Sequence, residues 1–129
     1  MRVAIARTGE TVAPCLEYSA TMAIFTIEEG AITDQLDFPL RSRDPFDRVR
    51  LLRDQEVDTV ICGGVMEKYE DLLKASRIQV ISWVSGPVEQ LLNLFLRGQL
   101  VPGSHPGQVT PGRAQMAREQ STSRKQRRT

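Results

Sequence analysis

The sequence predicts an α/β layered domain in which helices pack on a mixed sheet of about five strands. Residues 1–101 alternate short β-branched runs with amphipathic segments that carry helix-start signals. The order of these segments is β-β-β-α-β-α-β-α. The last strands and helices require right-handed parallel crossovers, whereas the first three strands can form an antiparallel meander.

The first three strands are expected at residues 2–7, 22–28 and 32–38. The second and third flank a turn that contains Gly30, which can adopt a positive φ, so they are expected to form a hairpin. In the third strand Ile32, Leu36 and Phe38 alternate with polar residues, so these three apolar side chains are predicted to share one face.

Two further strands and three helices complete the predicted domain. The first helix is expected to begin with Asp44 as its N-cap and Pro45 in its first turn. A β-branched run at 59–62 predicts an interior strand, because it is short and continuously apolar. The second helix is expected to carry an apolar face, formed by Met66, Tyr69, Leu72 and Leu73.

A β-strand pattern followed by a helix-capping sequence predicts the last strand and the last helix. Residues 79–84 predict the strand. The sequence Ser85-Gly86-Pro87 is expected to provide the cap and the proline start of the last helix. Gly98 is expected to end that helix.

Composition describes a globular chain and excludes several classes. Of 129 residues, 40% are hydrophobic and 26% are charged, which is typical of a folded soluble protein. No apolar run reaches the roughly 18–20 residues of a membrane span. Two cysteines cannot form a disulfide framework and are expected in a reducing compartment. The sequence therefore predicts a cytoplasmic protein that does not contact membranes.

The formal net charge of +1 hides an acidic body and a basic tail. Residues 1–101 contain 11 basic and 15 acidic residues, whereas residues 102–129 contain six basic and one acidic residue. The tail is rich in Pro, Gly, Ser and Gln, so it is predicted to be disordered. It is either a solubilising extension or a docking arm for an acidic partner. No aromatic residue interleaves with its arginines, so nucleic-acid binding is not expected.

Candidate binding residues follow the predicted parallel strands, whose carboxyl ends are the usual ligand edge of an α/β sheet. The thiols of Cys15 and Cys62 are soft ligands for copper, zinc or a metal–sulfur cluster. Backbone N–H groups, small residues and one cation near the same edge favour an anion: Arg7, Thr8, Gly63, Gly64, Ser85 and Gly86.

Each of these features also has a purely structural interpretation. Cys62 can be a small buried apolar residue, and Cys15 an inert loop thiol. The glycine pair Gly63-Gly64 can serve only a tight turn, and Ser85 only a helix cap. Trp83 is expected to pack in the core or at its rim.

Catalytic motifs are absent from the sequence, and no enzymatic activity is predicted. There is no phosphate-binding P-loop, no nucleophile elbow and no Cys-x-x-Cys pair. Residues 1–101 contain no histidine, which excludes a Ser–His or Cys–His pair within them. A nucleophilic Cys15 is a weaker alternative, because the nearby carboxylate of Glu17 would raise the thiol pKa.

Five stretches taken in order resemble the dinitrogenase iron–molybdenum cofactor-binding family. The likeness spans residues 1–101 and lies in the segments 1–6, 25–30, 57–65, 78–81 and 86–100. The resemblance implies a ribonuclease-H-like fold and a carrier or scaffold for an anionic metal–sulfur cluster. The family includes carriers in nitrogenase cofactor assembly and the orange protein of sulfate-reducing bacteria, which holds a molybdenum–copper–sulfide cluster.

The resemblance implies a molybdenum-containing cluster, with copper or iron, and cofactor-assembly or other cytoplasmic proteins as partners. Where the family often has a Ser-Pro-His-like stretch, this chain has Ala13-Pro14-Cys15, so a thiol replaces the common histidine. That replacement favours a soft, sulfide-rich cluster, whose charge Arg7, Arg41 and Arg43 could balance. The alternative function is a metal-free protein-interaction module that docks through its acidic body and basic tail.

Overall fold

The computed structural model describes residues 1–42 and 44–103, so most of the predicted tail lies outside the described residues. The strands are β1 (Arg2–Thr8), β2 (Thr11–Val12), β3 (Thr21–Glu28), β4 (Ala31–Pro39), β5 (Thr59–Ile61) and β6 (Gln79–Ile81). The helices are the 3-10 turn η1 (Leu16–Tyr18), α1 (Pro45–Asp54), α2 (Glu67–Ala75) and α3 (Val88–Leu96). No helix within the described residues is both long and apolar enough to cross a membrane.

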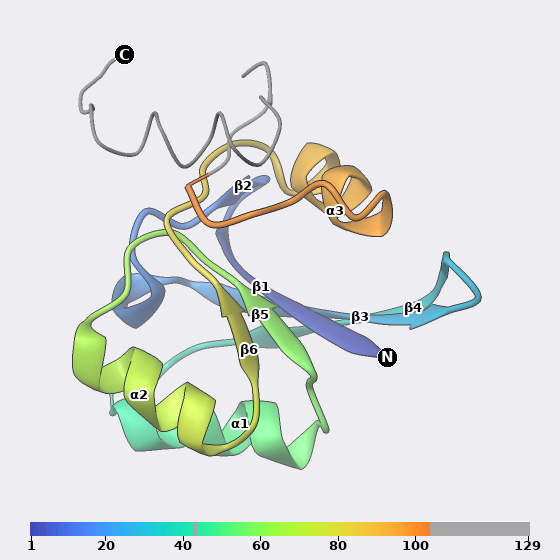
Figure 1. Cartoon of the computed structure of the whole chain (residues 1–129). Helices are drawn as coiled ribbons and strands as arrows, with labels where there is room; N and C mark the ends of the chain where they lie inside the picture. Colours follow the sequence, from blue (N-terminus) through green and yellow to red (C-terminus); the bar gives the residue numbers. More distant parts are fainter. Residues whose placement is uncertain (43, 104–129) are drawn as a thin grey trace.

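The strands form one mixed sheet in the order β4-β3-β1-β5-β6, with the short β2 paired to β1 (Figure 1). β1, β5 and β6 run parallel, and β3 runs antiparallel to both β1 and β4. The predicted fold class is confirmed. The prediction missed β2 and η1, since two- and three-residue elements leave no periodic pattern in the sequence.

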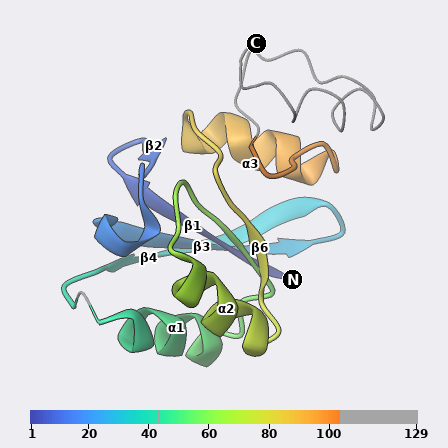
Figure 2. The ribbon, with the colours of Figure 1, turned by 60° about the vertical axis from the view of Figure 1, so that its left-hand side comes forward.

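Helices cover both faces of the sheet, with α1 and α2 on one side and α3 on the other (Figures 1 and 2). Successive side chains of a strand point to opposite faces, so β1 contributes to both layers. Ala4 and Ala6 belong to the hydrophobic cluster beneath α1 and α2, whereas Val3 and Ile5 belong to the cluster beneath α3. This central strand therefore fixes both halves of the core.

A bulge in the β3–β4 hairpin overturns the predicted face of Ile32. The turn forms as expected, with Glu29 and Gly30 at positive φ. The register then shifts beside Thr26, so Ile32 pairs with Ile27 rather than continuing the alternation that places Leu36 opposite Ile24. Because Ile27 belongs to the α3-side cluster, Ile32 lies on the α3 face and Leu36 on the other.

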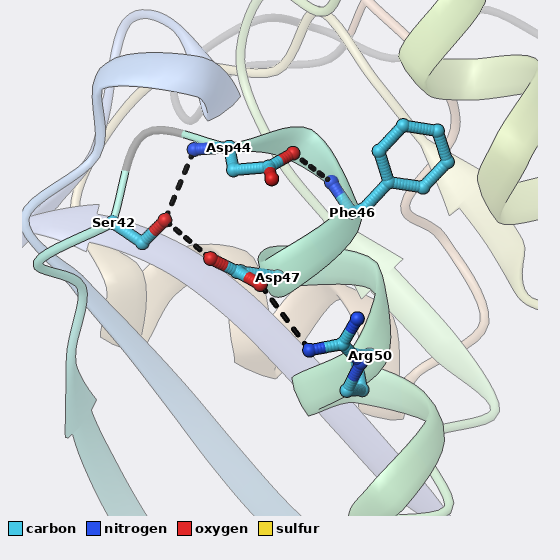
Figure 3. A network of polar contacts seen from close by, with 5 residues as sticks. All are labelled: Ser42, Asp44, Phe46, Asp47 and Arg50. Atoms are coloured by element: carbon cyan, nitrogen blue, oxygen red, sulfur yellow. Dashed lines mark hydrogen bonds and ion pairs between the residues drawn. The ribbon is translucent and has the colours of Figure 1, made fainter.

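The start of α1 matches the prediction. The Asp44 side chain accepts a hydrogen bond from the Phe46 N–H at 2.9 Å, and Pro45 occupies the first turn. The Ser42 hydroxyl accepts from the Asp44 N–H and donates to Asp47, whose carboxylate also contacts Arg50 (Figure 3). This network sets the direction in which α1 enters the domain.

The starts of the other two helices differ from the prediction. Met66 is the N-cap of α2 and is 60% exposed, so it does not belong to the apolar face of that helix. Pro87 occupies the N-cap of α3 without a side-chain cap, so Ser85 lies outside the helix and does not cap it. Gly98, at a φ of 71°, follows the end of α3 as predicted.

Candidate functional site

The segment after β1 is bound along its length to the loops that follow β5 and β6. The Gly64 N–H donates to Pro14 O at 2.7 Å, and the Leu16 N–H donates to Gly64 O at 2.8 Å. On the other side, the Val12 N–H donates to Gly86 O at 3.0 Å. The predicted convergence of three chain segments at one edge of the sheet is therefore present, and backbone hydrogen bonds hold it together.

The two glycines allow two backbones to lie against each other. A Cβ at Gly63 would overlap the carbonyl oxygen of Ala13 and would lie 2.7 Å from that of Pro14. A Cβ at Gly64 would lie 3.1 Å from the ring of Trp83 and 3.2 Å from Pro14 O. Other parts of the chain fill the space beside both glycines, and the Gly64 N–H is already hydrogen-bonded to Pro14 O. The packing of these two positions follows the structural interpretation.

Cys15 lies where these segments meet, a region that we call the Cys15 junction. Cys15 is half-buried and pairs with Gly64 in an isolated parallel β-bridge. Its thiol donates a hydrogen bond to Glu17 Oε1 at 2.8 Å. The other oxygen of Glu17 accepts from the Met66 N–H at 2.7 Å, and Glu17 itself is only 8% exposed. The hydrogen bond to the Glu17 carboxylate raises the pKa of the Cys15 thiol, and partial burial adds to the increase. The thiol is therefore protonated at neutral pH.

Cys62 lies in the core beneath the junction and is completely buried. Burial raises the pKa of its thiol to about 12, with a smaller contribution from the charge of Glu17. Its backbone connects the ends of β5 and β6, because its N–H donates to Ile81 O and its carbonyl accepts from the Val84 N–H. In this arrangement the Cys62 sulfur has no exposed surface for a ligand.

A buried arginine supports the Cys15 junction from α1. Arg48 is 2% exposed, and its guanidinium donates to Leu16 O at 3.1 Å and to Ser19 Oγ at 2.9 Å. Within the described residues, Arg48 Nε and the hydroxyl of nearby Tyr69 are buried without a hydrogen-bond partner. The arginine thus ties η1, which directly follows Cys15, to the body of the domain.

The sequence predicts Trp83 in the core or at its rim, and the structure places it at the rim, with its ring against the buried Gly64. Trp83 is 65% exposed and does not pack in the core. Its backbone adopts a φ of 60°, a conformation that bulky residues rarely take, and its N–H donates to Gly63 O at 2.9 Å. Backbone strain of this kind persists where the surroundings enforce it and is frequent at functional sites. A lone Trp after a strand gives no signal of this geometry in the sequence.

Glu17 and Met66 are further residues of the junction that the sequence does not reveal as such. The sequence indicates Glu17 only as a neighbour of Cys15, and Met66 only as part of a helix face. Both are tied to Cys15 through one carboxylate. Only the fold brings the N-cap of α2 to a residue 49 positions earlier in the chain, so no local pattern could have shown this contact.

The remaining predicted residues lie on other parts of the same edge. Arg7 points toward the α3 face, where it donates to Gly9 O at 2.6 Å and pairs with Asp37 at 3.2 Å. Thr8 and Ser85 are exposed, and Gly86 is half-buried at a φ of 122°. Among the described residues, the N–H groups of Ser85 and Gly86 take part in no backbone–backbone hydrogen bond.

The structure therefore brings Cys15 together with Gly63 and Gly64 and separates them from Arg7. Arg41 is exposed beside a shallow cavity of about 170 Å³ near the start of α1, and Arg43 lies outside the described residues. Within the described part of the chain, no three His, Cys, Asp or Glu side chains are placed to hold a metal ion together. Any cluster bound here would rest on few side-chain ligands.

Comparison with solved structures finds the same fold in several proteins. The crystal structure of PH0822 superposes with a TM-score of 0.73 at 19% identity, covering 78% of this chain and 92% of that one. The MJ0327 protein of Methanocaldococcus jannaschii gives 0.68 at 20% identity, covering 82% and 97%. The apo form of the orange protein of Desulfovibrio gigas gives 0.64 at 20% identity, covering 83% and 96%.

Comparison with protein families gives one match over most of the chain. No curated protein matches the sequence. The family described as dinitrogenase iron-molybdenum cofactor matches residues 1–98, which include all the strands and helices of the described residues and the whole Cys15 junction. The chain therefore belongs to the dinitrogenase iron-molybdenum cofactor family.

Proposed function

We propose that this chain binds and carries an anionic metal–sulfur cluster as cargo at the junction around Cys15. The cluster would contain molybdenum together with copper or iron. Membership of the cofactor family supports the class of cargo. The observation that carries the proposal is the half-exposed thiol of Cys15, held in place where three backbone segments meet. Thiolates are suitable contacts for such soft, sulfide-rich groups.

The donor set of the junction fits a weakly held cargo better than a permanently ligated metal. Cys15 offers one accessible sulfur once its thiol has lost its proton. The exposed Met66, two residues after Gly64, offers a thioether as a second soft contact. Cys62 would need the core to open before it could bind, so its role as a second ligand remains a prediction. A carrier must release what it binds, and a single soft contact allows release.

Contacts from the backbone and from charged groups would supply the remaining attraction. The N–H groups of Ser85 and Gly86 are the available donors on this edge, together with the hydroxyl of Thr8. Arg7 is already paired with Asp37, so its contribution to an anionic cargo would require that pair to open. These residues act as a binding surface, and the proposal includes no catalytic step.

Reconstitution of the full chain under anaerobic conditions tests this proposal. The protein is incubated with tetrathiomolybdate and Cu(I), or with molybdate, iron and sulfide, and is then desalted. Metal content and visible absorption report retained cargo. Trp83 is the only tryptophan of the chain and lies against Gly64, so its fluorescence should fall as the cargo binds.

Two matched cysteine variants locate the contact. Cys15→Ser should lose most of the retained metal and of the Trp83 quenching, whereas Cys62→Ser should retain both if only the exposed sulfur is used. Equal retention by the two variants would overturn the assignment to Cys15. If no stoichiometric metal survives desalting in the unmodified chain, the carrier function itself is wrong.

A metal-free interaction module is the second candidate function. It is favoured by the exposed side chains of Tyr18, Met66 and Trp83, which come from three segments that meet near Cys15. Exposed aromatic and methionine side chains are enriched in protein interfaces. A partner captured from the host without metal, and lost in Trp83→Ala, would support this function over cluster carriage.

A further inference from the structure

A second concave surface lies on the α3 side of the sheet, away from Cys15. It is a groove of about 390 Å³ between the start of α3 and the β3–β4 hairpin. Figure 2 shows α3 lying over that side of the sheet. We call it the α3 groove; its lining residues are Arg7, Glu10, Phe25, Ile32, Gln35, Val88, Glu89 and Leu92.

The floor of the α3 groove is apolar. Phe25 and Leu92 are each 5% exposed and belong to the core cluster under α3. Ile32 remains 42% exposed at the edge of the groove, because the bulge in the hairpin places it on this face. An apolar side chain entering the groove would cover Ile32 and remove apolar surface from water.

The mouth of the α3 groove carries negative charge that nothing in the described structure neutralises. Glu10 and Glu89 are both exposed, and no described residue forms an ion pair with either. The lining residues include one cation, Arg7, and Asp37 already pairs with it. The groove therefore fits a segment that combines an apolar side chain with two positive charges.

The C-terminal segment of the chain has this composition. Residues 104–129 contain six basic residues and one acidic residue. The large apolar side chains among them are Val109 and Met116, and Met116 is flanked by Arg113 and Arg118. This short run offers one flexible apolar side chain between two arginines, which matches the floor and the mouth of the groove.

The described chain ends on the correct side of the sheet. Leu100 is buried in the α3-side cluster, and the Gly103 N–H donates to Ser82 O at 3.0 Å. Arg113 lies ten positions after Gly103, and an extended chain of that length reaches roughly 33 Å. A domain of about 100 residues has a radius of gyration near 13 Å, so the segment can reach the groove.

We propose that residues 113–118 of the same chain dock in the α3 groove. Met116 contacts the apolar floor, and Arg113 and Arg118 face Glu10 and Glu89. Tethering raises the local concentration of the segment to the order of millimolar, so a weak contact is enough to populate the docked state. The proposal does not rest on cluster carriage, since the groove shares only Arg7 with the proposed cargo surface and does not include Cys15, Gly63 or Gly64.

Amide NMR spectra of the full chain at low salt test the proposal. The variant Arg113→Glu/Met116→Ser/Arg118→Glu should shift the amide signals of groove residues such as Ile32, Gln35 and Val88. The matched control Arg124→Glu/Arg127→Glu makes the same change in net charge and should leave those signals nearly unchanged. Added salt should shift the unmodified chain toward the spectrum of the first variant, because screening weakens the contact.

Protease protection provides a second readout. Trypsin should cut after Arg113 and Arg118 several-fold more slowly than after Arg124, and Glu10→Lys/Glu89→Lys should remove that difference. If the amide signals of groove residues do not change in Arg113→Glu/Met116→Ser/Arg118→Glu, or change equally in Arg124→Glu/Arg127→Glu, docking of this segment is overturned. Shifts that depend on protein concentration, together with a dimer in diffusion measurements, would assign the groove to a second copy and overturn docking within one chain.

Discussion

The Cys15 junction and the α3 groove flank the same segment after β1, yet they are built in different ways. Backbone groups hold the junction together, with Gly64 hydrogen-bonded on both sides and Gly63 packed against carbonyl oxygens. Side chains line the groove, and all of them except Glu10, in the turn after β1, lie on strands or on α3. The junction should therefore be sensitive to small changes in the main chain, whereas the groove should tolerate substitution.

Gly63→Ala should produce the largest loss of stability. The added methyl group would overlap the Ala13 carbonyl, and a backbone atom cannot move aside easily. We expect a loss of about 3 kcal/mol in the free energy of unfolding, measured by urea denaturation. Gly64→Ala is the control, because its Cβ meets the ring of Trp83 at 3.1 Å, and we expect about 1 kcal/mol there. Equal losses would mean that the junction adjusts more freely than the structure indicates.

Arg48→Met should also destabilise the junction. The substitution keeps an apolar stem but leaves the buried Leu16 carbonyl and Ser19 hydroxyl without their charged donor. We expect a loss of about 2 kcal/mol in the free energy of unfolding. Arg50→Met removes an exposed partner of Asp47 and should cost less than about 0.5 kcal/mol. If the two variants are equally stable, Arg48 does not support η1.

Alkaline pH should weaken the fold through Cys62. Its thiol pKa is raised to about 12 in the folded chain, so an unfolded chain loses this proton first as the pH rises above about 9. Folding is then disfavoured with a slope of up to about 1.4 kcal/mol per pH unit between these two values. Urea midpoints measured from pH 7.5 to 10 should fall less steeply in Cys62→Ala. An unchanged slope in that variant would contradict the assignment.

Glu17→Gln should make Cys15 more reactive. Glu17 raises the thiol pKa by hydrogen bonding and by its charge, so the neutral amide should lower that pKa and increase the thiolate fraction at pH 8. We expect iodoacetamide to modify Cys15 about three- to tenfold faster, because the thiolate is the reactive form. Mass spectrometry of the Cys15 peptide measures the rate. A rate equal to that of the unmodified chain would exclude control by Glu17.

Glu10→Gln/Glu89→Gln in the α3 groove should have the smallest effect on stability. Both side chains are exposed, and no described residue pairs with them. We expect the free energy of unfolding to change by less than about 0.5 kcal/mol. A loss comparable to that of Gly63→Ala would show that the groove is as constrained as the junction.

Local chemistry made much of the fold predictable. Asp44 and Pro45 mark a helix start because they satisfy orphan N–H groups and preset φ, and the structure has the helix there. The error at Ile32 has a physical cause, since one extra residue in a strand reverses the faces of its neighbours beyond the bulge. The sequence did not decide whether Trp83 lies in the core or at its rim, because that depends on its packing against Gly64 in another segment.

The candidate site was predictable only in outline. The general rule for α/β sheets brought Cys15 close to Gly63 and Gly64, and the structure joins them. The same rule could not predict that Cys15 is accessible and Cys62 buried, because burial depends on how the segments pack over one another. It also could not place Glu17 between Cys15 and Met66, a contact between residues far apart in the sequence.

The sequence by itself determined the class of fold, the charge division between body and tail, and the set of residues at one edge of the sheet. Periodicity, capping residues and composition are local properties, so they can be recognised in the sequence without knowledge of the tertiary contacts. Only the tertiary structure decided that Cys15 is accessible while Cys62 is buried, and that Arg7 faces the groove beside α3. Those outcomes depend on burial and long-range hydrogen bonds, which arise when distant segments pack against one another.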